Sequence, residues 1–187
     1  MSNSSLEWRI FVFVVRQIIF GGVAERFCCC YCRVILSGFV MNLNFPPINI
    51  PTKEEGEKVY IYDIVRKKYV LLTPEEWVRQ HLIHFLVNER QYPLGLIAVE
   101  RGLTHNNIKR RTDVVVYTRA LSPWLIAECK APDVRITQHT FNQVARYNMA
   151  LQVPLLVVTN GIYHFCCQID YHLHTYKYLP DIPPYHN

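Results

Sequence analysis

The chain has 187 residues, of which 50% are hydrophobic and 13% aromatic, enough apolar material for a folded core, so a largely disordered chain is excluded. Its formal net charge of +5 is compatible with a polyanionic partner but does not by itself establish one. Among the seven cysteines, no C-x-x-C motif is followed by a second one at zinc-finger spacing. We therefore interpret them as reduced thiols within strands rather than as a structural zinc site.

The first 40 residues differ from the rest because their apolar runs are broken by charges such as Arg16 and Arg33. No run approaches the roughly 20 apolar residues that a membrane helix needs. A clean apolar run with a small-residue cleavage site is missing too, so a secretory signal fits poorly. We expect residues 1–40 to be an extension, or a start-site artefact, outside a functional domain at 41–187. A membrane anchor is the second interpretation of the extension.

A regular pattern begins after residue 41. Residues 44–51 are proline-rich and extended, and 58–72 alternate in polarity as two short strands around a charged turn. A helix is predicted at 74–88, since Thr73 is a good N-cap and Pro74 suits the first helical position. Apolar residues then recur at helical spacing.

The remaining segments predict a mixed β-sheet. In chain order we expect a strand at 94–103, a polar loop at 104–111, strands at 112–118 and 123–130, a helix at 137–150, strands at 154–160 and 162–170 around a tight turn at Asn160–Gly161, and a loose tail at 179–187. The apolar run at 154–160 is typical of a strand buried on both faces. This order predicts an α/β domain with a mixed sheet flanked by helices.

Two carboxylates and an ammonium interrupt the apolar strands at Asp113, Glu128 and Lys130. Side chains alternate along a strand, so Glu128 and Lys130 share a face. If residues 119–122 form the hairpin loop, Asp113 lies opposite Glu128, with Cβ atoms about 5 Å apart. Two carboxylates that close repel each other unless a cation lies between them, and magnesium prefers such oxygen ligands.

Lys130 has two interpretations at this position. An ammonium there can orient the attacking water, help to deprotonate it or offset phosphate charge in metal-assisted phosphodiester hydrolysis. It can equally form an ion pair with Glu128 or Asp113 at an exposed strand edge. The three residues alone leave both interpretations open.

Three further features favour the chemical interpretation. Glu75 precedes Val78 by three residues, which places it toward the core, where an acid needs a positive partner. Glu76 is the alternative candidate. Either acid can also simply stabilise the positive N-terminal end of the helix. Gln143 and Tyr147 are four residues apart on the second helix, so they can line a groove or lie on solvated surface. The basic residues of "IKRR", Lys109, Arg110 and Arg111, are candidate phosphate contacts or a solvated loop.

Taken together, Asp113, Glu128-x-Lys130 and Gln143-x-x-x-Tyr147 resemble the PD-(D/E)XK nuclease superfamily. The segments "PEEWVRQ", "KRRTDVVVY", "LIAECKAP", "NQVARYN" and "VTNG" resemble the N-terminal domains of type I restriction enzyme R subunits that occur as small stand-alone proteins. The similarity spans about residues 45–170. Thr112 stands where the superfamily usually has a proline.

The resemblance implies a restriction-endonuclease-like core and a site for Mg²⁺ or Mn²⁺. Its implied metal ligands are Asp113, Glu128, the backbone carbonyl of Cys129 and an acid from the first helix, Glu75 or Glu76. It implies Lys130 as the residue that activates water, and Gln143 and Tyr147 as a supporting element, with Gln143 among the catalytic groups. From their positions we also expect Lys109, Arg110, Arg111 and Tyr147 to contact nucleic acid.

The expected function is that of a magnesium-dependent DNA endonuclease in restriction or repair. No G-x-x-x-x-G-K-[ST] motif is present, so we expect no motor activity and no nucleotide cofactor. The alternative is a nucleic-acid-binding module that keeps the fold without turnover; branched or RNA substrates remain open. We expect a cytoplasmic protein that binds DNA and no membrane, and leave a homodimer open.

Overall fold

The computed structural model describes residues 42–105, 108–173 and 175–186, without the side chains at 103–105, 108–111, 138, 142, 146, 147, 149 and 150. A small antiparallel sheet comes first, with strands β1 (Thr52–Glu55), β2 (Lys58–Asp63) and β3 (Lys68–Leu71). The two predicted strands at 58–72 are confirmed, whereas β1 was not predicted.

The large sheet has six strands in the order β4-β5-β6-β7-β8-β9. Its strands are β4 (Ile97–His105), β5 (Ile108–Tyr117), β6 (Pro123–Cys129), β7 (Leu155–Thr159), β8 (His164–Asp170) and β9 (Thr175–Leu179). Strands β6 and β7 are parallel and the other neighbours antiparallel, so the predicted mixed sheet is confirmed. All five residues of β7 are buried, as its apolar run predicted.

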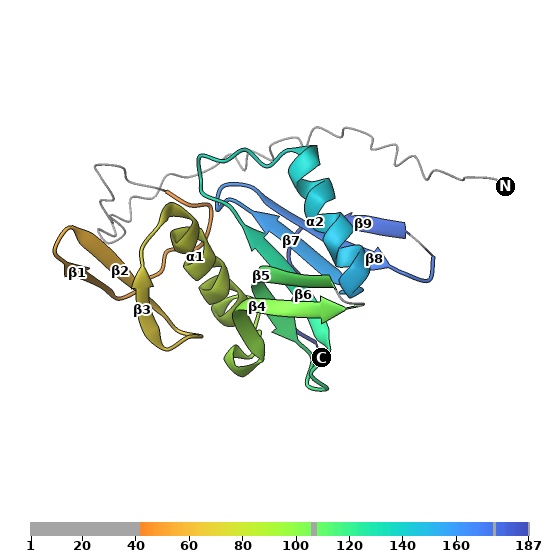
Figure 1. The fold of residues 1–187 in the computed structure, drawn as a ribbon, viewed down its shortest axis with the longest axis horizontal. Helices are drawn as coiled ribbons and strands as arrows, with labels where there is room; N and C mark the ends of the chain where they lie inside the picture. Colours follow the sequence, from red (N-terminus) through yellow and green to blue (C-terminus); the bar gives the residue numbers. More distant parts are fainter. Residues whose placement is uncertain (1–41, 106–107, 174, 187) are drawn as a thin grey trace, which may run out of the picture. The chain divides into compact units, whose positions relative to one another are not determined.

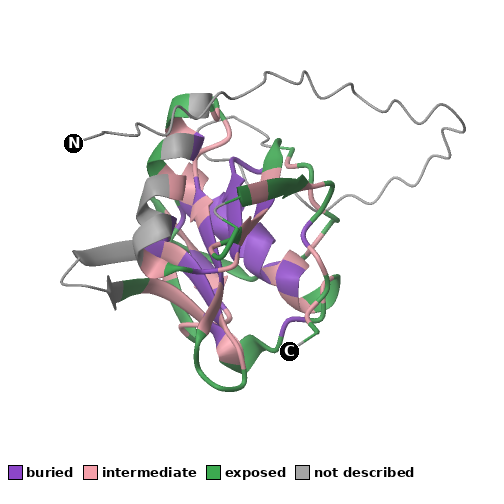
Figure 2. Ribbon diagram, turned by 90° about the vertical axis from the view of Figure 1, so that its right-hand side faces the viewer, coloured by how far each residue is buried: buried purple, intermediate pink, exposed green. Residues whose placement is uncertain are grey.

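Two helices flank this sheet: α1 (Pro74–Asn88) and α2 (Gln138–Leu151). Side chains alternate along β5, so Val114 packs in the cluster that contains Leu82 of α1, and Val115 packs in the one that contains Phe141 of α2. Helix α1 also contacts the small sheet, where Trp77 packs with Ile61 (Figure 1). Buried residues concentrate in the strands of the large sheet and in α1 (Figure 2).

The predicted start of α1 is confirmed in detail. The Thr73 hydroxyl accepts the N–H of Glu76 at 3.1 Å, and Pro74 occupies the first helical position. Within the described part of the chain, neither helix combines the length and apolar character that a membrane crossing requires.

The predicted loop at 104–111 was wrong. Strands β4 and β5 extend into this segment from its two sides and pair with each other, with Thr104 paired to Lys109 and Gly102 to Arg111. Polar side chains do not prevent a strand when its backbone groups find partners in a neighbouring strand. Strand β9 was also missed because its sequence, Thr175–Leu179, lacks a clean apolar alternation.

The expected loose tail packs onto the body of the domain. Ile182 is buried, the Tyr92 hydroxyl donates to the carbonyl of Pro183 at 3.0 Å, and the N–H of Tyr185 donates to the carbonyl of Arg90 at 2.9 Å. The prolines that suggested a loose end instead fit an extended segment, because they need no backbone donor partner.

Gly161 allows the turn after β7 to approach the segment that precedes the small sheet. Its φ is +83°, and an added Cβ would lie 2.6 Å from Leu43 and 3.0 Å from Val78. We expect Gly161→Ala to lower the free energy of unfolding by about 1–3 kcal/mol, measured in urea. Gly95→Ala is the control, since nothing lies within 4 Å of its added Cβ. Equal losses in the two variants would contradict this role.

Candidate active site

The β5–β6 register brings the two predicted carboxylates together. Val114 pairs with Ala127, so Asp113 and Glu128 are the next positions along the two strands. The hairpin end differs from the prediction: Pro123 pairs with Tyr117 rather than Thr118, and a bulge between Val116 and Tyr117 restores the expected register. The inner part of the hairpin, which positions the acids, is therefore as predicted.

Asp113 lies beside the strand segment that carries the other site residues. Its Oδ2 accepts the backbone N–H of Cys129 at 2.7 Å. Glu128, on one side of Cys129, accepts a hydrogen bond from the Lys130 ammonium at 2.7 Å. The N–H of Lys130 donates to the carbonyl of Thr159 at 2.8 Å, which fixes this segment on β7. The three predicted residues thus gather where the middle of β5 runs beside the end of β6.

The two acids at the start of α1 differ from the expectation. Glu76 is the buried one, with 7% of its side chain exposed, whereas the Glu75 side chain is 43% exposed. Glu76 accepts hydrogen bonds from Arg66 at 2.7 Å and from Gln80 at 2.8 Å, and from Arg79. Spacing to Val78 alone misplaced the core side of the first turn, because the buried Arg79 and the partly buried Arg66 satisfy Glu76 there.

Arg79 joins α1 to the site and was missed by the sequence analysis. Its Nη2 lies 3.1 Å from Glu75 Oε1 and 3.0 Å from Asp113 Oδ1. Its Nη1 contacts Glu76 and lies 3.8 Å from Glu100 Oε1. A signal was present, since Arg79 follows the two acids by four and three residues on a predicted helix.

A second arginine extends this ionic cluster to the small sheet. Arg66, in the turn after β2, contacts Asp63, Glu76 and Glu100. Glu100 has φ +53° in the middle of β4, between the pairs Val99–Val114 and Arg101–Thr112, and therefore stands opposite Asp113. Left-handed backbone at a non-glycine residue is strained and is often found at functional sites.

Burial and charge act in opposite directions on the site's basic groups. Burial by itself lowers the pKa of Lys130, but the Glu128 hydrogen bond and the charges of Glu128, Asp113 and Glu75 outweigh it and raise the pKa above its usual value. Burial also lowers the pKa of Arg79, and Asp113 and Glu76 outweigh it. Lys130 is therefore an ammonium at neutral pH. Burial raises the pKa of the Cys129 thiol well above its usual value, which excludes it as a thiolate nucleophile.

The remaining predicted residues are placed less fully. Gln143 is exposed on α2. Lys109, Arg110 and Arg111 lie in β5, so their backbone is strand rather than loop, but their side chains and that of Tyr147 lie outside the described residues. Their contacts with nucleic acid stay predictions.

The donor chemistry of the site fits a hard divalent cation. Among the described residues, no three histidine, cysteine, aspartate or glutamate side chains converge as a metal cluster. Magnesium, however, is commonly held by one or two carboxylates together with waters and substrate phosphates. One nitrogen of the Arg79 guanidinium already contacts both Asp113 and Glu75, so the two carboxylates converge on a single positive group.

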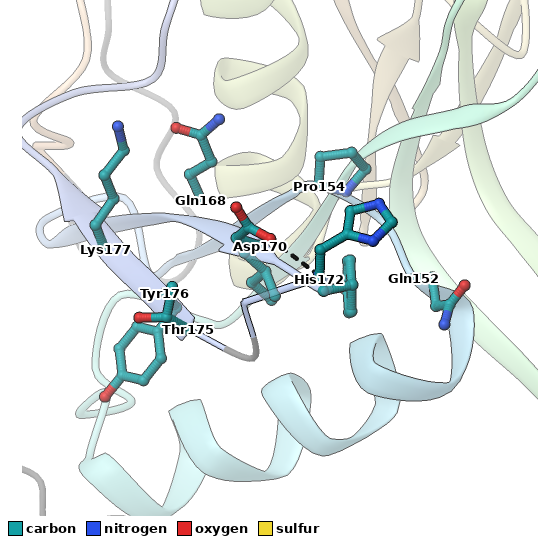
Figure 3. Close-up of a pocket in the computed structure, with 10 residues that line it drawn as sticks. Gln152, Pro154, Gln168, Asp170, His172, Thr175, Tyr176 and Lys177 are labelled. Carbon is teal, nitrogen blue, oxygen red and sulfur yellow. Dashed lines mark hydrogen bonds between the residues drawn. The ribbon is translucent and has the colours of Figure 1, made fainter.

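A cavity of about 660 Å³ lies elsewhere, around the ends of β8 and β9. Its side chains do not converge, because Gln168 and Lys177 extend to one side and Tyr176 to the other (Figure 3). Asp170 there accepts the backbone N–H of His172 at 2.9 Å, which closes the turn. The cavity is therefore a weaker candidate site than the cluster around Asp113.

The fold and site define a mixed-sheet α/β domain with acids and a lysine gathered between the middle of β5 and the end of β6. The family "Type I restriction enzyme R protein N terminus (HSDR_N)" matches residues 74–183, so the chain belongs to this family. No curated protein matches the chain.

One similar solved structure is a fragment described as an HsdR subunit of a type I restriction enzyme from Vibrio vulnificus YJ016. It is 19% identical with a TM-score of 0.44, and the match covers 60% of this chain and 24% of that chain. The chain thus spans about a quarter of the length of that structure.

Proposed function

We propose that this domain is a magnesium-dependent DNA endonuclease of the PD-(D/E)XK type, related to restriction or repair. The hydrogen bond from the Cys129 N–H to Asp113 carries the proposal, because Cys129 stands between Glu128 and Lys130. That contact brings together two carboxylates and an ammonium from different strands. The family to which the chain belongs supports a restriction-related role.

Each residue has a role in this proposal. Asp113 and Glu128 would hold Mg²⁺ or Mn²⁺, with Glu75 as a further carboxylate. The carbonyl of Cys129 would assist, because the N–H and C=O of one strand residue face the same neighbouring strand. The cation would polarise the phosphodiester and lower the pKa of the attacking water. Lys130, as an ammonium, orients the attacking water and offsets charge on the phosphate.

Gln143 and Tyr147 would act from α2, with Gln143 supporting catalysis and Tyr147 contacting the nucleic acid. Lys109, Arg110 and Arg111 would contribute phosphate contacts along β5, which would make binding sensitive to salt. DNA is the proposed substrate because the matching family is named for a restriction enzyme subunit.

A binding module without turnover is the second candidate. It is favoured by the satisfied state of Asp113, whose two oxygens already contact Arg79 at 3.0 Å and Cys129 at 2.7 Å. A carboxylate whose two oxygens are both hydrogen-bonded can have a purely structural role, here joining α1 to β6. The two candidates differ in whether Asp113 binds a divalent cation.

Asp113→Asn tests the proposed metal ligand. The variant keeps the shape of the side chain but loses its charge, so we expect Mn²⁺ affinity to fall at least about tenfold in calorimetric titration, which corresponds to 1.4 kcal/mol. Asp133→Asn is the control, since Asp133 is an exposed acid in the loop after β6. Wild-type affinity in a folded Asp113→Asn protein would remove Asp113 from the metal site.

A further inference from the structure

Arg79 is the most buried charged group that contacts the site. Only 6% of its side chain is exposed, and its guanidinium reaches carboxylates from three elements: Glu75 and Glu76 of α1, Glu100 of β4 and Asp113 of β5. A buried charge is retained only when it is paired, so these acids and Arg79 depend on one another.

The two guanidinium ends face different acids. Nη1 contacts Glu76 and Glu100, which Arg66 also contacts. Nη2 bridges Glu75 and Asp113, two of the three carboxylates that the proposed function assigns to the cation. Arg79 thus contacts both of these carboxylates through a single nitrogen.

We propose that Arg79 is a resident counter-ion that couples cation loading to DNA binding, an inference that rests on the proposed function. With no divalent cation bound, the guanidinium holds Asp113 and Glu75 together against their mutual repulsion. The same positive charge opposes a second cation beside Asp113 and weakens its binding. The phosphates of a bound nucleic acid add negative charge, which offsets the positive charge of Arg79 and favours binding of the divalent cation.

This arrangement makes cation and nucleic acid bind cooperatively. If DNA raises the affinity for the cation by some factor, the cation must raise the affinity for DNA by the same factor. Arg79 is a positioning residue in this account, since it contacts the carboxylates and not the reacting atoms.

The test removes the charge of Arg79 and measures Mn²⁺ binding directly. Arg79→Met keeps a long apolar stem, so in titrations without nucleic acid it should bind Mn²⁺ about tenfold more tightly than the wild type. Its melting temperature in EDTA should fall, and Mn²⁺ should recover part of that loss. Arg119→Met, at an exposed hairpin position, is the matched control and should leave both quantities unchanged.

A second pair of titrations tests the coupling to DNA. With a short duplex oligonucleotide, in a Lys130→Ala background that limits cleavage, Mn²⁺ affinity should rise about tenfold when Arg79 is present and clearly less when it is methionine. If Arg79→Met does not fold, the double variant Glu76→Gln with Arg79→Met removes one acid and one base together. The double variant should also bind Mn²⁺ more tightly.

The outcomes separate this inference from the proposed function. Equal or weaker Mn²⁺ binding by the folded variants, with measurable binding by the wild type, would overturn the role of Arg79 and leave the metal site standing. Absence of Mn²⁺ binding in every protein, with and without DNA, would remove the proposed metal site itself and this inference with it.

Discussion

Lys130→Ala should slow DNA cleavage by about 10²–10³-fold, the loss typical when one group that stabilises charge in the transition state is removed. The Lys130 ammonium is held 2.7 Å from Glu128, and although burial lowers its pKa, this hydrogen bond and the charges of Glu128, Asp113 and Glu75 outweigh burial and raise the pKa. It is therefore placed to act on the attacking water and on charge that develops at the phosphate. Binding of Mn²⁺ should not weaken, because the variant keeps every carboxylate.

Cleavage rate and melting temperature should be measured on the same preparation of Lys130→Ala. Lys177→Ala, an exposed lysine of β9, is the control and should cleave at the wild-type rate. In a purely structural interpretation Lys130 only neutralises Glu128, so its loss would lower stability while cleavage per folded molecule persists. Near-normal cleavage by a well-folded variant would take Lys130 out of the active site.

Asp63→Ala should produce the largest loss of stability among the substitutions considered, about 3–5 kcal/mol in the free energy of unfolding. The Asp63 side chain is fully buried. One of its oxygens accepts the N–H groups of Val65 at 2.7 Å and Arg66 at 2.8 Å, and the other contacts the Arg66 guanidinium. The variant leaves Arg66 partly buried without this partner and frees the turn that directs it toward Glu76.

Urea unfolding measures this effect, with Glu57→Ala in the exposed β1–β2 turn as the control. The control should change stability by less than about 0.5 kcal/mol. A loss below about 1 kcal/mol for Asp63→Ala would mean that the ionic cluster does not depend on this turn.

Local patterns predicted the elements that their own residues specify. The capping signal at Thr73, the apolar spacing of α1 and the uninterrupted apolar run of β7 depend on neighbours in sequence, and the structure confirms all three. The register that aligns Asp113 with Glu128 was predicted from side-chain alternation and an assumed loop at 119–122. It holds because the bulge between Val116 and Tyr117 compensates for the pairing of Pro123 with Tyr117.

Elements that depend on distant partners were not predictable in the same way. Strand β9 has exposed residues at three of its five positions and owes its place to pairing with β8. The tail is held by contacts to Tyr92 and Arg90, more than 90 residues earlier in the chain. Burial of Glu76 depends on Arg66, which comes from another element. Such contacts leave no periodic trace in the sequence.

Cleavage of nucleic acid with and without magnesium is the direct test of the proposed nuclease activity. Purified protein would be incubated with plasmid, linear single-stranded DNA and RNA, in Mg²⁺ or in EDTA, beside Lys130→Ala prepared in the same way. We expect DNA products only in Mg²⁺, with far fewer from Lys130→Ala than from the wild type. Binding of DNA without products, products that persist in EDTA, or cleavage confined to RNA would contradict it.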